Sequence, residues 1–115
     1  MVKITGIDIF KMDMEYSYVV AIALGAVPTA DNILIRINTD AGVVGWGEGS
    51  PYPPITGENQ ATCIEAAKYI AHSLIGADPT TIERQTQQIK RMLPSHSSVR
   101  SAFDMAFWDI LGKLA

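Results

Sequence analysis

Glycine is concentrated around a single tryptophan in the middle of the chain, where Gly45-Trp46-Gly47-Glu48-Gly49 follows a turn at Thr39-Asp40-Ala41-Gly42. Glycine weakens a strand, because it has no side chain to pack and loses the most backbone entropy on folding. This density therefore predicts that another part of the backbone approaches the strand closely, or that the strand bulges or bends. Pro51, Pro53 and Pro54 then stiffen the next loop, since each fixes its own φ and lacks an N–H.

The composition indicates one globular domain of 115 residues, with 48% hydrophobic and 18% charged residues. A net charge of −3 gives no electrostatic basis for binding nucleic acid or an anionic membrane. No apolar run reaches the ~18 residues that a membrane span needs. The single Cys63 excludes an internal disulfide framework, so we expect a cytoplasmic location.

Alternating apolar residues predict three antiparallel strands, over residues 2–14, 32–38 and 43–49. In the first strand the apolar residues change face after Ile9, which indicates a bulge or a strand covered on both faces. Residues 15–31 contain strand formers, but Gly25 and the small residues near it favour a long loop. A loop of this length in a small domain is usually functional.

Three helices follow the strands, so the predicted fold class is α+β. The first runs over about 57–75, with Thr56 as N-cap and Gly76 as its stop, and Asp78-Pro79 opens the second. The third begins near residue 97 and continues to residue 115. Apolar residues cover more than half of its circumference, which predicts burial on two sides. We expect the second side to contact a partner or further polypeptide, and the chain to be truncated there.

No set of residues in the chain is sufficient for catalysis or for metal binding. His72 and His96 lack the spacing of a zinc site, and Cys63 is interpreted as a core residue. Glu48 is the strongest polar candidate, although a carboxylate there usually accepts hydrogen bonds from loop or helix-start N–H groups. Glu58 is expected to complement the dipole of the first helix. Trp46 is expected in the core.

The order of these elements and two motifs resemble a known family. The motifs are Gly42-Val43-Val44-Gly45-Trp46-Gly47-Glu48 and the final helix, Ser101-Ala102-Phe103-Asp104-Met105-Ala106-Phe107-Trp108-Asp109-Ile110-Leu111-Gly112-Lys113. With Ile55-Thr56-Gly57-Glu58 between them, they resemble the N-terminal capping domain of the enolase superfamily, in the muconate-lactonizing-enzyme and mandelate-racemase-like subgroup. The resemblance covers residues 1–115 and is closest to the dipeptide epimerases.

The resemblance implies that this domain is a lid and that the chemistry lies elsewhere. Family members continue into a (β/α)₈-type barrel, where carboxylates hold Mg²⁺ and lysines move a proton α to a carboxylate. This chain has no such barrel, so we expect it to contain no catalytic residue, to bind no metal, and to be inactive alone. Its expected partners are that barrel, a small carboxylate substrate and further copies in a homo-oligomer.

Two segments correspond by position to the family's substrate-selecting loops, residues 15–30 and 49–57. The candidate substrate-binding residues on them are Tyr16, Tyr18, Val19, Ile22, Gly25, Tyr52 and Ile55. Epimerases for acidic dipeptides tend to carry an arginine in the first loop, whereas no basic residue lies between Lys11 and Arg36 here. An epimerase for apolar or small dipeptides is therefore preferred.

Other functions remain open. The domain could cap a muconate cycloisomerase or an o-succinylbenzoate synthase-like lyase, since these enzymes share the same cap. It could also be a free-standing α+β interaction module that uses the exposed face of the last helix. The residues do not reveal the substrate, the stereochemistry or the oligomeric state.

Overall fold

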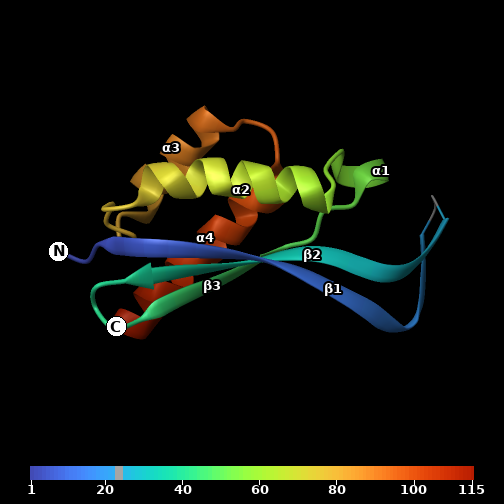
Figure 1. The fold of residues 1–115 in the computed structure, drawn as a ribbon, viewed down its shortest axis with the longest axis horizontal. Helices are drawn as coiled ribbons and strands as arrows, with labels where there is room; N and C mark the ends of the chain where they lie inside the picture. Colours follow the sequence, from blue (N-terminus) through green and yellow to red (C-terminus); the bar gives the residue numbers. More distant parts are fainter. Residues whose placement is uncertain (23–24) are drawn as a thin grey trace.

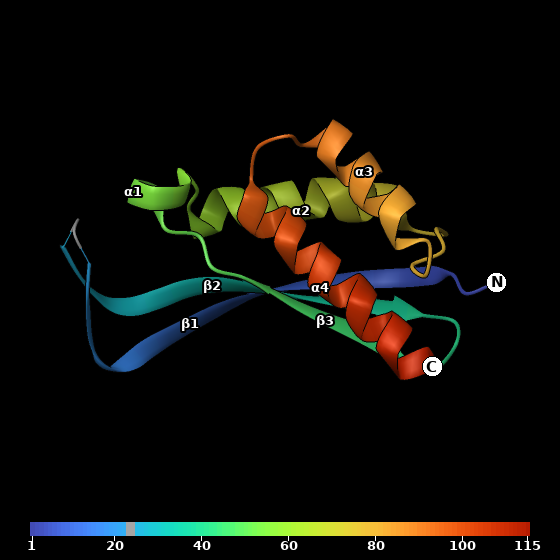
Figure 2. The same ribbon diagram turned by 180° about the vertical axis from the view of Figure 1, so that it is seen from behind.

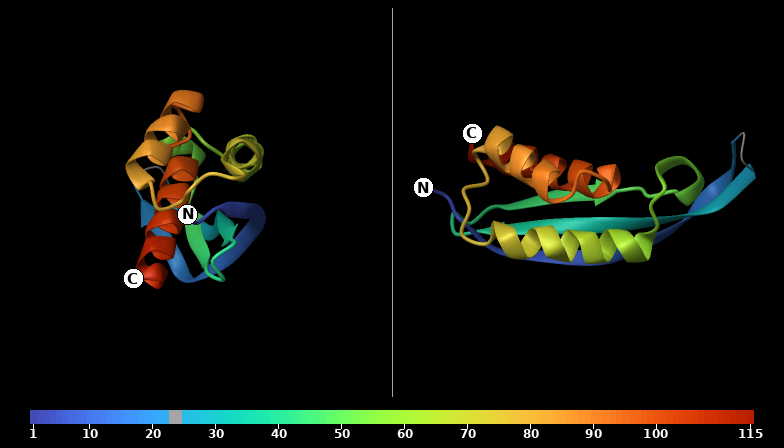
Figure 3. Two further views of the ribbon diagram at one scale, coloured as in Figure 1. Left: turned by 90° about the vertical axis from the view of Figure 1, so that its left-hand side faces the viewer. Right: turned by 90° about the horizontal axis from the view of Figure 1, so that it is seen from above.

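A three-stranded antiparallel sheet carries helices on one face (Figures 1 and 3). The fold is known from a computed structural model, which describes the backbone of residues 1–22 and 25–115 and the side chains of 1–13, 31–53 and 56–115. In chain order the elements are β1 (Ile4–Ile22), β2 (Gly25–Thr39), β3 (Val44–Gly49), α1 (Pro53–Thr56), α2 (Gln60–Leu74), α3 (Ile82–Met92) and α4 (Ser97–Leu114). The predicted α+β class, with a meander before the helices, is confirmed.

The hairpin of β1 and β2 is much longer than the sequence analysis predicted. Residues 15–31 were expected to form a loop, but the strands continue to Ile22 and resume at Gly25, and Val20 pairs with Val27. The physical reason is that aromatic and β-branched residues fill this part of β1 and favour a strand. Pairing across a hairpin also satisfies backbone groups that a loop would leave to water. An irregularity between Glu15 and Val20 interrupts the ladder.

The register of β1 corrects the predicted position of the bulge. Pairing with β2 is unbroken from Gly6 to Glu15, so the change from Ile9 to Phe10 is ordinary alternation between the two faces. The register shift lies earlier, between Ile4 and Gly6. This shift lets Ile4 face the core, where it is buried, although Ile7 and Ile9 of the same strand also pack there.

Helix α4 lies directly on the glycine face of β3, as Figure 2 shows from behind. A Cβ atom at Gly47 would overlap the carbonyl oxygen of Ala102 and lie 2.7 Å from its carbonyl carbon. A Cβ at Gly45 would overlap the carbonyl of Ala106, and one at Gly49 would lie 2.9 Å from the carbonyl of Ser98. The predicted close backbone approach is therefore confirmed, and only glycine fits at Gly47.

The core lies between the sheet and helices α2, α3 and α4. Its largest fully buried side chains are Phe103, Phe107, Ile4, Ile33, Ile35, Ile37, Ile70, Leu74, Ile89 and Ile110. Trp46 is not among them, contrary to prediction. Because neighbouring strand residues face opposite ways, the glycines that face α4 place Trp46 on the outer face of the sheet, where it is 38% exposed. There its ring stacks on Phe10, and the Arg36 guanidinium lies 5.4 Å from each ring.

Two predicted helix starts are corrected as well. Asn59, not Thr56, caps α2, because its side chain accepts a hydrogen bond from the Thr62 N–H and the Thr62 side chain completes a capping box. Thr56 instead ends the short α1. Asp78 caps a turn before α3 through the Thr80 N–H, so the helix begins at Ile82.

The predicted end of the first long helix is confirmed. Gly76 follows α2 with a φ of 85°, a conformation that glycine adopts without strain. The last helix, α4, begins at Ser97, one or two residues before the predicted start after Ser97 or Ser98, and extends to Leu114. Among the helices described, none is long and apolar enough to span a membrane.

Candidate functional site

The two predicted substrate-selecting segments lie at the same end of the molecule. Figure 1 shows the far part of the β1–β2 hairpin and helix α1 together at one end, beyond the start of α2. The view from above in Figure 3 shows the same arrangement. The described backbone of residues 15–22 and 25–30 is thus near residues 49–57, although 18 residues of chain separate the two segments.

The candidate residues on these segments occupy defined places on the backbone. Tyr16, Tyr18, Val19 and Ile22 belong to the terminal part of β1, and Gly25 is the first residue of β2. The side chains of these residues and of Ile55, which lies in α1, fall outside the described part of the structure.

Tyr52 is the one candidate whose side chain is described. It is half-buried, and it precedes α1 as the N-cap residue. Its backbone N–H donates to Thr56 Oγ1 at 3.0 Å, and its carbonyl accepts from the same hydroxyl at 3.0 Å. Gly57 ends α1 with a φ of 73°. These bonds and the flanking prolines support the prediction of a stiff second segment.

Two pairs of polar side chains lie at the base of both segments, one pair on each face of the sheet, and the Asn32 backbone carbonyl joins them. Asn32 is buried, and its side-chain amide donates to Glu48 Oε1 at 2.6 Å. The Gln60 amide donates to Asp13 Oδ1 at 2.8 Å and to the Asn32 carbonyl at 2.9 Å. We name these four residues, Asp13, Asn32, Glu48 and Gln60, the base cluster. It joins β1, β2, β3 and α2 at the point where the hairpin leaves the body of the domain.

Glu48 therefore has a role different from the one predicted. The sequence analysis expected it to accept hydrogen bonds from loop or helix-start N–H groups, but its partner is the Asn32 side chain on the neighbouring strand. Leu34 of β2 lies directly opposite Glu48, so Asn32 reaches it diagonally across the outer face of the sheet.

Glu58 stabilises a different helix from the one predicted. It is buried, and its Oε1 accepts from the Ser98 N–H at 3.3 Å and from the hydroxyls of Ser97 and Ser98. It thus supplies negative charge at the N-terminus of α4, whose N-cap residue His96 makes no side-chain cap. Sequence spacing could not reveal this, because Ser97 lies 39 positions after Glu58 in the chain.

Cys63 is a buried core residue, as predicted. Burial, followed by the hydrogen bond to the Glu58 carboxylate at 3.3 Å and the charge of that carboxylate, raises the pKa of its thiol to about 12. A thiol with this pKa is neutral at physiological pH and a poor nucleophile. Cys63 is therefore no candidate for covalent catalysis.

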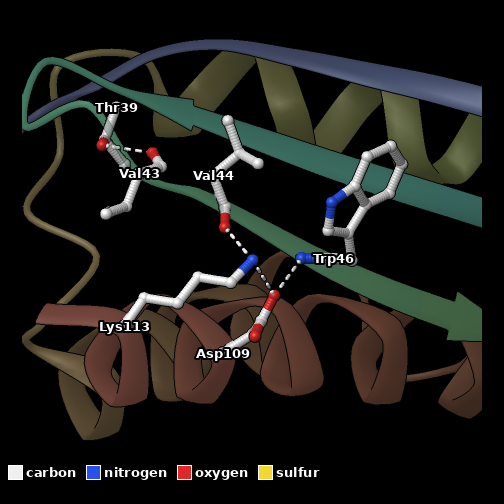
Figure 4. A network of polar contacts seen from close by, with 6 residues as sticks. All are labelled: Thr39, Val43, Val44, Trp46, Asp109 and Lys113. Atoms are coloured by element: carbon white, nitrogen blue, oxygen red, sulfur yellow. Dashed lines mark hydrogen bonds and ion pairs between the residues drawn. The ribbon is translucent and has the colours of Figure 1, made fainter.

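A second polar network closes the free edge of the sheet (Figure 4). Asp109 Oδ2 accepts from the Trp46 N–H at 2.9 Å and from Lys113 Nζ at 3.0 Å, and Lys113 Nζ also donates to the Val44 carbonyl at 2.7 Å. The Trp46 N–H and then Lys113 hold the pKa of Asp109 below its ordinary value. The pair thus occupies backbone groups of β3 that another strand could otherwise bind.

The exposed apolar surface of α4 adjoins a groove. Trp108 is 58% exposed and Met105 47% exposed, whereas Phe103 and Phe107 are fully buried. The groove, with a volume of about 1060 Å³, lies between α3 and α4 and includes Trp108 in its wall. None of the residues that line this groove belongs to the base cluster or to residues 49–57.

The described residues do not combine into a metal site or a catalytic set. Where side chains are described, no three His, Cys, Asp or Glu residues lie together in a way that could hold a metal ion. His72 is exposed on α2, and His96 precedes α4 with Ser95 Oγ 3.0 Å from its Nδ1. The side chains that the structure describes therefore offer no ligand set for Mg²⁺.

Sequence reasoning missed most of the base cluster. Only Glu48 was singled out, whereas Asp13, Asn32 and Gln60 were not. One available signal was Asn32, a polar residue that immediately precedes the alternating isoleucines of β2. The other signal was the position of Gln60 as the first residue of α2, directly after the capping Asn59. A side chain at the start of a helix can reach the strands that lie beside that start.

Comparison with known proteins identifies relatives over nearly the whole chain. Residues 4–115 match the model of the mandelate racemase / muconate lactonizing enzyme N-terminal domain. A D-Ala-D/L-Ala epimerase from Cytophaga hutchinsonii and a hydrophobic dipeptide epimerase from Enterococcus faecalis are each 30% identical, over 97% and 98% of this chain. An N-succinyl-L-Arg/Lys racemase from Bacillus cereus is 28% identical over 96% of the chain.

Solved structures show the same fold. A crystal structure of the dipeptide epimerase from Cytophaga hutchinsonii, complexed with Mg and the dipeptide D-Ala-L-Val, superposes with a TM-score of 0.93 at 29% identity, over 97% of this chain and 30% of that one. The chain spans about a third of the length of these relatives, 30% and 32% of the two epimerases. The chain belongs to the mandelate racemase / muconate lactonizing enzyme family of the enolase superfamily, as its N-terminal capping domain.

Proposed function

We propose that residues 1–115 are the substrate-selecting cap of a Mg²⁺-dependent racemase or epimerase that acts on dipeptides. The reaction would proceed by abstraction of a proton α to a carboxylate. The family assignment and the epimerases and racemase among the relatives support an isomerase. The observation that carries the proposal is the position of residues 15–30 and 49–57 at one end of the domain, where they can close over a single substrate (Figure 1).

The proposed division of labour follows from the side chains present. The described residues offer no metal site, so the proposal places Mg²⁺ and the proton-transferring bases on a C-terminal barrel. When bound there, Mg²⁺ would stabilise negative charge that develops on the substrate carboxylate. This domain would instead exclude water and contact the side chains of the substrate. Tyr52 and Ile55 would form one fixed wall of the substrate-binding site. Residues 15–30 would form the other wall, which is longer and more variable.

The exposed face of α4 is the proposed contact with the barrel. Trp108 and Met105 leave apolar surface uncovered beside the groove between α3 and α4. Apolar surface of this kind is usually covered in the assembled protein. A homo-oligomer and a cytoplasmic location complete the proposal, the latter supported by the buried, reduced Cys63.

The proposed substrates are dipeptides with apolar or small side chains. Between Lys11 and Arg36 the chain contains no basic residue, so the first segment lacks a cation that could pair with an acidic side chain. An apolar binding surface disfavours a substrate with an acidic side chain, because the buried carboxylate loses its hydration without gaining a partner. The names of the Cytophaga and Enterococcus epimerases, for Ala-Ala and for hydrophobic dipeptides, are consistent with this preference.

Exchange of the substrate α-proton tests the proposal directly. The complete protein that carries this domain would be incubated in D₂O with Mg²⁺ and a set of dipeptides, and deuterium at each α-carbon would be measured by mass spectrometry. We expect exchange in Ala-Leu and similar dipeptides, none after chelation of the metal, and none with residues 1–115 alone. Conversion of cis,cis-muconate without exchange in any dipeptide would instead favour a cycloisomerase. The absence of both reactions would favour an interaction module.

A further inference from the structure

The base cluster lies at both ends of both substrate-selecting segments. Asp13 precedes residues 15–30 and Asn32 follows them, while Glu48 precedes residues 49–57 and Gln60 follows them. The three hydrogen bonds between these side chains and the Asn32 carbonyl measure 2.6–2.9 Å. A single connected set of bonds therefore joins the roots of two segments that are separate in sequence.

The set depends on few bonds, because its two side-chain pairs are joined only through the bond from Gln60 to the Asn32 carbonyl. Asn32 is only 5% exposed, so water cannot replace Glu48 as the hydrogen-bond partner of its side-chain amide unless the structure opens locally. Both N–H groups of the Gln60 amide are used, one on β1 and one on β2. Because Gln60 is the first residue of α2, these bonds also fix the start of that helix to the hairpin.

We propose that the base cluster couples the two segments, so that the position of each depends on the other when they contact a substrate. Asp13, Asn32, Glu48 and Gln60 are then positioning residues, which act on substrate selection without touching the substrate. This inference rests on the proposed function, because it assumes that both segments contact the same substrate.

Gln60→Glu breaks the cluster with the smallest change in shape. The new carboxylate faces the Asp13 carboxylate and the Asn32 carbonyl, both of which are acceptors. A carboxylate at the first position of a helix is favourable to the helix itself, so α2 should remain folded. Gln88→Glu on the exposed face of α3 is the matched control, since it makes the same chemical change far from both segments, in the α3 wall of the groove and not on the α4 face proposed to meet the barrel. Asp13→Ala removes one acceptor without adding charge and serves as a second variant.

The first measurement is a double-mutant cycle in the complete enzyme. Gly25→Arg and Tyr52→Ala, alone and combined, are assayed for kcat/KM on Ala-Leu and Ala-Glu, with the cluster intact and with Gln60→Glu. Coupled residues typically deviate from additivity by about two- to a hundredfold. We expect a deviation of at least about threefold with the cluster intact or with Gln88→Glu, and less than about twofold with Gln60→Glu or Asp13→Ala. Equal deviations in all backgrounds would overturn the proposal.

The second measurement does not depend on activity. Hydrogen exchange of the backbone amides would be compared between the wild type, Gln60→Glu and Gln88→Glu. Loss of the cluster should accelerate exchange in both residues 15–30 and residues 49–57 by about three- to tenfold, and the control in neither. Faster exchange in one segment only, or in neither, would overturn the coupling. An enzyme that exchanges no substrate proton would refute the proposed function, but this second measurement would still test the cluster.

Discussion

Gly47→Ala should destabilise the domain more than any other single methyl group added to β3. The new Cβ would overlap the carbonyl of Ala102, which is backbone of α4 and cannot turn aside as a side chain could. Overpacking of a core usually costs about 1–3 kcal/mol, and a clash with backbone belongs at the upper end. The lower entropy of the unfolded alanine chain offsets about 0.4–1 kcal/mol of this cost. We therefore expect a net loss of about 2–3 kcal/mol.

Urea denaturation of the 115-residue chain, followed by the fluorescence of Trp46 and Trp108, measures this loss. The midpoint should fall with an unchanged slope, and Tm should fall by about 8–12 °C. Gly112→Ala is the matched control: Gly112 lies in α4 with open space around it, so alanine there should stabilise the chain by about 0.5–1 kcal/mol. The order of destabilisation should be Gly47, Gly45 and then Gly49. A Gly47→Ala variant within about 0.5 kcal/mol of the wild type would refute the close packing of α4 on β3.

Three further predictions concern Asp109 and Cys63. Asp109→Asn should destabilise the chain by about 1 kcal/mol at neutral pH. Because the pKa of Asp109 is lowered, this difference in the free energy of unfolding should be constant above pH ~4 and should disappear as the pH falls through the lowered pKa. Urea denaturation at several pH values measures it. A difference that persists in acid would contradict the prediction. The pKa of Cys63 is raised to about 12 in the folded chain, so the free energy of unfolding should fall as the pH rises from ~8.5 toward that value. Cys63→Ala should remove this contribution to the pH dependence of stability. At pH 8 a maleimide should label native Cys63 at least about a hundredfold more slowly than the urea-unfolded chain, and rapid labelling would contradict its burial.

The parts of the fold that depend on local sequence could be predicted. Alternation of isoleucines in β2, the stop at Gly76 and the start of α4 each follow from residues within a few positions. Close approach of backbone to the Gly45–Gly49 strand was one of the predicted explanations for its glycines, beside a bulge or a bend, and the unbroken pairing of β3 with β2 favours it.

The parts that depend on distant partners could not. On local sequence, Gly25 indicates the end of a strand or a loop. Only its pairing with Ile22 shows that β1 and β2 continue to these two residues. Trp46 is apolar, but its face is set by where α4 packs. Thr56 and Asn59 are both good N-cap residues, and the reciprocal bonds of Thr62 decide between them.

The candidate site divides in the same way. Family resemblance located the two segments, because their neighbouring motifs are contiguous in the sequence. The base cluster could not be predicted, since it needs the register of three strands and the start of α2 together. Glu58 illustrates the same limit: its proximity to α2 in sequence suggested one helix, whereas the fold brings it to α4.

The most direct test of the account is the specificity of the complete enzyme with Gly25→Arg. Gly25 begins β2 in the first segment, where the chain carries no positive charge. If this segment reads the substrate side chain, an added arginine should favour an acidic substrate. One contact with a charged group is worth about 1.5–3 kcal/mol, or roughly ten- to a hundredfold in relative kcat/KM.

The measurement is kcat/KM of the wild type and of Gly25→Arg on Ala-Leu and Ala-Glu. Tyr69→Arg, on the exposed side of α2, controls for the added charge. We expect the wild type to prefer Ala-Leu and Gly25→Arg to shift the ratio toward Ala-Glu by ten- to a hundredfold, roughly the value of one charged contact, while Tyr69→Arg leaves it unchanged. An unchanged ratio in Gly25→Arg would contradict the claim that this domain selects the substrate.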